Sequence, residues 1–140
     1  MNRRRVLVAI SAAQLAAGVV GQVIAVRDRK PFDLSLLGQR GRPEDVLRDS
    51  VFNGTALSAP LTMLLTQAVA TVRLGKGPSA VAARTLGVLG ATMTCGYLLE
   101  REFRSALSPE GLDPIVTPVA ASGFALAIAM ARSGLQPLAP

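Results

Sequence analysis

The side chains best suited to chemistry gather at one predicted boundary between helix and water. Asp49 and Asn53 are four residues apart, where a helix is expected to enter an apolar run, so they share one helical face. Tyr97 and Glu100 end another apolar run, and Arg101 follows directly. Carboxylate and amide oxygens are ligands that hard cations prefer. The sequence therefore predicts a candidate polar mouth formed by Glu100, Tyr97, Asp49, Asn53 and Arg101.

A purely structural interpretation of the same residues is favoured. Glu100 lies one turn beyond Tyr97, which fits the headgroup level that aromatic side chains prefer. Arg104 is four residues further on and could pair with Glu100 across one helical turn. We therefore expect Glu100 to be a solvated or paired helix end. The acids of the mouth are expected to form salt bridges to nearby arginines.

The residue inventory argues against an enzyme. The chain contains no histidine, which removes the commonest general base and a common metal ligand. Its one cysteine, Cys95, stands in an apolar run, so an internal disulfide is impossible. We predict no catalytic residue, no cofactor and no metal. A carboxylate-based activity within the membrane, using Glu100, Asp49 and Tyr97, is the minor alternative.

Four stretches without any charge predict the elements that position these residues. They cover 6–26, 51–72, 85–99 and 114–131, and a bilayer core of about 30 Å needs roughly twenty helical residues. The predicted fold class is all-α, an antiparallel four-helix bundle in a membrane, with residues 1–140 as a single transmembrane domain. The helices are expected at about 5–26, 51–73 with a kink at Pro60, 80–99 extending to about 107, and 114–131. The 27–50 loop should carry a short amphipathic segment at the interface.

Small and polar residues recur on the expected helix faces. Small residues at a spacing of four let helix backbones approach closely in lipid, and hydroxyl groups can hydrogen-bond across the contact. Packing is the favoured interpretation of these faces, and a narrow substrate path lined by amides is the alternative. The candidate packing or path-lining positions are Gln14, Gln22, Ser58, Thr62, Thr66, Gln67, Gly87 and Ala91.

Charge predicts the orientation. With four spans, seven Lys and Arg residues fall on the side of the termini and eight on the other side, while all nine acids fall on that other side. A wholly basic side suits an anionic cytoplasmic leaflet. We expect a multi-pass protein of the plasma membrane with both termini in the cytoplasm. The opening "MNRRR" and apolar run also resemble a signal peptide, but the run is longer than usual, so we favour a retained first helix.

These observations favour a non-enzymatic membrane protein that works through helix contacts, as an accessory subunit or a homo-oligomer. The alternative is a carrier or binder of a small apolar molecule or lipid, which would enter from the acidic, aromatic-rimmed side. The expected partners are membrane lipids and other membrane helices, with no nucleic acid, because topology explains the basic residues. The excess of arginine over lysine is typical of bacterial genomes rich in G and C.

Overall fold

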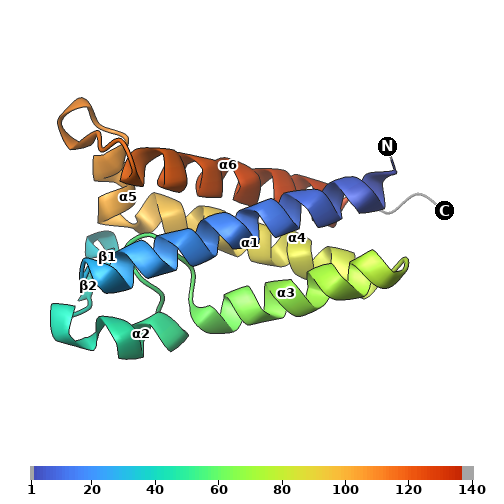
Figure 1. The fold of residues 1–140 in the computed structure, drawn as a ribbon, viewed down its shortest axis with the longest axis horizontal. Coiled ribbons are helices and arrows are strands. Elements are labelled where there is room, and N and C mark those ends of the chain that lie inside the picture. Colours follow the sequence, from blue (N-terminus) through green and yellow to red (C-terminus); the bar gives the residue numbers. More distant parts are fainter. Residues whose placement is uncertain (1, 137–140) are drawn as a thin grey trace.

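The computed structural model describes residues 2–136 and is predominantly helical, which confirms the all-α part of the predicted fold class. Four long helices make up most of the chain: α1 (Arg3–Arg27), α3 (Leu61–Lys76), α4 (Ala80–Leu99) and α6 (Val116–Leu135). α1 contacts α3 and α6, and α4 contacts the same two helices. Neighbouring helices in this ring run in opposite directions (Figure 1).

The antiparallel order gives the molecule two different ends. The start of α1, the α3–α4 turn and the end of α6 lie at one end, which we call the basic end (Figure 1). The other end, the loop end, carries the connections over 28–60 and 100–115. At the basic end, the guanidinium of Arg4 donates to the carbonyls of Leu74 and Gly75, at 3.1 and 3.3 Å. These carbonyls close α3, so Arg4 ties α1 to the end of its neighbour.

Short elements fold over the loop end. A two-stranded antiparallel hairpin, β1 (Asp33–Leu34) and β2 (Gln39–Arg40), encloses the 3-10 turn η1 (Ser35–Leu37). The hairpin occupies the part of the 27–50 loop in which an amphipathic segment was expected, and its turn exposes Leu36 and Leu37. The remaining short elements are η2 (Pro43–Asp45), α2 (Val46–Phe52), α5 (Arg101–Ala106) and η3 (Pro109–Gly111).

The structure divides the helix that the sequence predicted over 51–73. α2 ends at Phe52, and α3 begins only after Pro60, which is its N-cap residue. Gly54 takes a left-handed conformation with φ 87°, and Thr55 pairs with Ser58 in a tight turn. Proline has no N–H and disfavours helix in the residue before it. Pro60 therefore starts a helix here instead of kinking one.

The predicted continuation of the third helix to about 107 is also broken. Glu100 has ψ 125°, an extended conformation that ends α4 and precedes α5. By length and composition, two described helices, α1 and α6, could cross a bilayer. α3 has 16 residues, which gives about 24 Å, and α4 contains Arg84 among many glycines and threonines. A membrane four-helix bundle thus stays a prediction.

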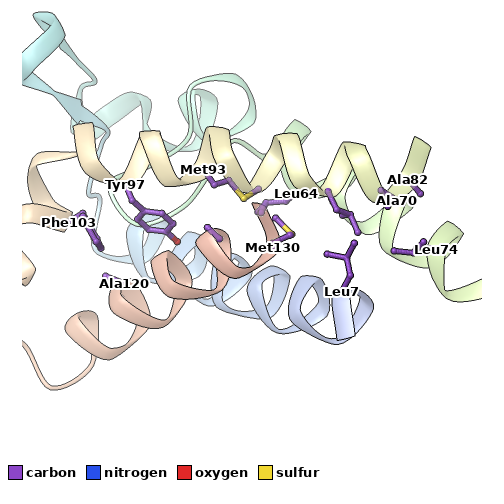
Figure 2. Close-up of a cluster of buried hydrophobic side chains, with 13 residues drawn as sticks. Leu7, Leu64, Ala70, Leu74, Ala82, Met93, Tyr97, Phe103, Ala120 and Met130 are labelled. Carbon is purple, nitrogen blue, oxygen red and sulfur yellow. The ribbon is translucent and has the colours of Figure 1, made fainter. Parts of the chain in front are cut away.

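The core lies along the axis of the four helices. Leu7, Leu64 and Met130 are buried between the helices that carry them (Figure 2). Towards the loop end, the rings of Tyr97 and Phe103 are tilted by 55° with their centroids 5.1 Å apart, and Phe124 contacts both rings. This aromatic cluster fixes the end of α4, and with it the position of Glu100.

Candidate functional site

Glu100 is buried at the loop end instead of facing water as expected. Its residue surface is only 5 % exposed, and both carboxylate oxygens accept the backbone N–H of Asp33, at 2.9 and 3.2 Å. The break between α4 and α5 turns this side chain under the β1–β2 hairpin, which covers it. The predicted pair with Arg104 is not among the ion pairs of the described residues. The interpretation as a solvated or paired helix end was wrong.

The surroundings of Glu100 oppose its negative charge. Burial raises the pKa of the Glu100 carboxyl to about 7, and the neighbouring acids Asp33 and Glu102 push it in the same direction. The backbone N–H of Asp33 acts the other way, because it stabilises the ionised form. Near neutral pH, this carboxyl can therefore gain or lose a proton.

A cavity of about 110 Å³ lies beside this carboxyl. It is lined by the end of α4, the 53–60 turn and the start of the hairpin, and its polar lining comes from Asn53, Thr55, Ser58, Tyr97 and Glu100. Thr55 is 5 % exposed, and its Oγ1 has no hydrogen-bond partner among the described residues. A buried hydroxyl without a partner is costly, so the cavity is suited to a polar occupant.

The structure brings part of the predicted polar mouth together. Tyr97, Glu100 and Asn53 line this cavity. Asp49 is not part of the lining, but its carboxylate accepts the side-chain amide N–H of Asn53 at 3.2 Å. Arg101 is not among the lining residues and forms an ion pair with Asp33, with its Nη1 3.7 Å from Asp33 Oδ2. Thr55, which completes the lining, was not a sequence candidate, because a predicted continuous helix hid the turn that carries it.

The predicted packing or path-lining residues are separated by the structure. Gln14 and Gln67 are buried in the core, Gln22 is partly buried, and Ser58 lines the cavity. Thr62 and Thr66 lie on the exposed face of α3. Gly87 lies against α6, and Ala91, on the same helix, is half-buried.

A buried polar network joins α1 to α3. Gln67 Nε2 donates to the Ser11 carbonyl at 2.9 Å, and the hydroxyls of Ser11 and Thr71 are 2.7 Å apart. Thr71 in turn donates to the carbonyl of Gln67 at 2.7 Å, which closes a ring of hydrogen bonds. The side-chain oxygens of Gln14 and Gln67 have no partner among the described residues. This network fixes the register of the two helices, and the loss of one member would remove buried hydrogen bonds between them.

Gln67→Ala should destabilise the protein by about 1–3 kcal/mol, because the change removes two buried hydrogen bonds that Gln67 Nε2 donates to Ser11. Thermal unfolding in a mild detergent measures this loss. The matched control is Thr66→Ala, since Thr66 is exposed and bonds only to the Thr62 carbonyl of its own helix. Equal unfolding midpoints for the two variants would show that the network contributes nothing.

An apolar groove that the sequence did not predict runs between α3 and α4. Its volume is about 680 Å³, within the range of ligand pockets. Val69 and Val81, 71 % and 77 % exposed, flank it, and Ala70 and Ala82 form its floor. The polar groups that line it are Arg73, Ser79, Thr66 and Thr85. The sequence does carry a signal for this groove. The helix is apolar on its inner face and also carries large apolar residues on its outer face.

Comparison of the chain with protein families, curated proteins and solved structures finds no match. Any functional assignment therefore depends on the chemistry of the cavity and the groove.

Proposed function

We propose that the protein is a non-enzymatic, multi-pass protein of the plasma membrane that binds an anionic lipid in the α3–α4 groove. The observation that carries the proposal is the groove itself, with an apolar interior and Arg73 in its lining. This is the lipid-binding alternative raised by the sequence, with a different entrance. The ligand enters from the basic end and not from the acidic side.

The outer surface of the bundle supports the membrane location. Large aliphatic side chains are exposed on all four long helices, among them Val19, Val20 and Val23 on α1, Leu65, Val69 and Val72 on α3, Val81 and Val88 on α4, and Leu135 on α6. Exposed apolar side chains on every long helix support contact of the bundle with lipid or with other proteins. In this proposal all four long helices cross the bilayer, and the short α3 is accommodated by local thinning of the membrane. The first helix is retained, because Leu7, Ser11 and Gln14 belong to the core.

Charge selects an anionic occupant for the groove. The basic end carries Arg3, Arg4, Arg5, Arg73, Lys76, Arg84 and Arg132, and no acid occurs in 1–27, 50–99 or 114–140. A second copy in the same membrane orientation would bring like charges together at this groove. An anionic headgroup complements Arg73, and the same charge pattern favours the cytoplasm for both termini.

The apolar interior suits an acyl chain. Leu65 and Val69 from α3 face the groove opposite Val81 from α4, so a chain lying there buries methylene groups against aliphatic side chains. Each buried methylene contributes about 0.8 kcal/mol. The headgroup would lie beside Arg73 and Ser79, at the turn between the helices.

Arg73→Gln should lower the retention of anionic lipid about five-fold, because one arginine near a membrane surface contributes roughly 1 kcal/mol to anion binding. Native mass spectrometry of the protein purified in mild detergent, with titration of phosphatidylglycerol, measures this change. Thr66→Phe, at an exposed position in the groove, should block the acyl chain. Arg132→Gln is the control, since Arg132 lies at the same end on α6, outside the groove lining. Equal lipid retention by the Arg73 and Arg132 variants would contradict the proposal.

The second candidate is an accessory subunit whose α4 contacts a partner helix. Val81 and Val88, seven residues apart and both exposed, form the stripe that favours it. In a Cys95→Ala background, a reagent with one thiol-reactive and one photoreactive group should then link Val88→Cys to one protein of constant mass in native membranes. Val23→Cys on α1, also exposed, is the control that should give no such product.

A further inference from the structure

We propose that the cavity beside Glu100 binds a small monovalent cation of the Na⁺ or K⁺ class. The proposal goes beyond lipid binding, because the cavity lies at the loop end and the groove at the basic end. It is based on three observations: an uncompensated buried carboxylate, oxygen ligands around it, and the size of the cavity.

The local charges leave Glu100 without a cationic partner. Arg40 and Arg101 both pair with Asp33, at 3.4 and 3.7 Å, and Lys30 pairs with Glu102 at 3.6 Å. No ion pair to Glu100 occurs in the part of the chain that the structure describes. A buried charge is costly unless it is paired. A bound cation would supply the missing partner.

The lining supplies the ligands that a hard cation prefers. Besides the Glu100 carboxylate, it offers the unpartnered Thr55 Oγ1, the Asn53 amide and the Ser58 hydroxyl. The Ser58 hydroxyl donates to the Ala59 carbonyl at 3.3 Å, so its lone pairs stay available. These are hydroxyl, amide and carboxylate oxygens, the donors that suit alkali and alkaline-earth ions.

Charge and size favour a monovalent ion. Glu100 is the only acidic residue in the lining, and nowhere in residues 2–136 do three His, Cys, Asp or Glu side chains converge. A volume of about 110 Å³ holds an ion with two or three waters, at about 30 Å³ per water. A bulky organic cation does not fit in this space.

A proton competes with the cation for the same carboxylate. The negative charges of Asp33 on β1 and Glu102 on α5 favour the binding of either a proton or a cation at Glu100. The nearby cations Arg101, Arg40 and Lys30 are paired with those two acids. Tyr97, from α4, is the remaining titratable side chain in the lining. Because the pKa of Glu100 is raised to about 7, cation binding should be strong at pH 8 and weak at pH 6.

The test compares cations at pH 8 and constant ionic strength in a neutral detergent. Replacing N-methyl-D-glucamine with Na⁺ or K⁺ should raise the unfolding midpoint saturably, by about 3–5 °C at cation concentrations well above the Kd. Glu100→Gln should abolish the response, and Glu110→Gln, an exposed acid of η3, should keep it. Thr55→Val, which removes only the Oγ1 ligand, should shift the half-maximal concentration several-fold upward.

Line broadening of ²³Na gives a second, direct measurement of binding that does not depend on unfolding. Broadening by the wild-type protein that is lost in Glu100→Gln and weakened in Thr55→Val would support the site. Equal broadening by the wild type and Glu100→Gln, or a midpoint that N-methyl-D-glucamine raises as much as Na⁺, would overturn the proposal.

Discussion

Gly134→Ala is expected to destroy the contact between α4 and α6 and to destabilise the protein by about 3 kcal/mol or more, as overpacking of a rigid contact does. A Cβ at position 134 would lie 2.6 Å from both the Ala83 carbonyl oxygen and the Gly87 Cα. Both are backbone atoms of α4, so no side chain can move aside. Gly87→Ala should have the same effect from the side of α4, because a Cβ at position 87 would lie 2.7 Å from both Gly134 C and Leu135 N.

Thermal unfolding in detergent, with helicity as the readout, measures the effect. Gly96→Ala is the matched control for Gly87→Ala, because it lies in the same helix and its Cβ would meet nothing within 4 Å. Replacing a helical glycine with alanine at such a position should be neutral or stabilising by about 0.5–1 kcal/mol. Midpoints for Gly134→Ala and Gly96→Ala that agree within a degree would show that the two helices do not pack this closely.

Glu100→Gln is expected to flatten the dependence of stability on pH. The folded protein binds the Glu100 proton up to about pH 7, whereas the unfolded chain releases it near its ordinary value of 4.5. A group whose pKa is raised by folding favours the folded state at low pH, and this contribution disappears as pH rises to the folded pKa. The wild type should thus lose about 3 kcal/mol between these two values, and the variant should not.

Unfolding midpoints measured from pH 4.5 to 8 in N-methyl-D-glucamine buffers, which contain no competing alkali cation, test this prediction. Glu110→Gln should keep the wild-type profile, because Glu110 is exposed. Wild-type and Glu100→Gln profiles that remain parallel would mean that Glu100 titrates as it does in water.

The sequence was sufficient to predict the helices because their signal is regular. Long stretches without charge indicated all four long helices. The start of the last one is held by Asp113, whose carboxylate accepts the backbone N–H groups of Ile115 and Val116, at 2.8 and 2.7 Å. The break at Pro60 was missed because an apolar run was assumed to be continuous, although Gly54 and Pro60 together carry the information for a turn.

The candidate site was less predictable because burial depends on tertiary contacts. Glu100 follows a helix and precedes Arg101, a local pattern that is typical of an exposed end. It is buried because β1, which is distant in sequence, folds over it and donates a backbone N–H. The exposure of Thr62 and Thr66 was unpredictable for the same reason. A spacing of four places residues on one helical face but does not tell whether that face is buried or exposed.

Photo-crosslinking with a phosphatidylglycerol analogue, diazirine-labelled on the acyl chain, tests lipid binding in the α3–α4 groove most directly. The protein would be labelled in native membranes, and the modified peptides would be mapped by mass spectrometry. The proposal predicts that labels concentrate in residues 65–73 and 79–85, which line the groove, and that Thr66→Phe removes them. Labels spread evenly over Val19, Val23 and the other exposed apolar positions of the bundle would contradict it.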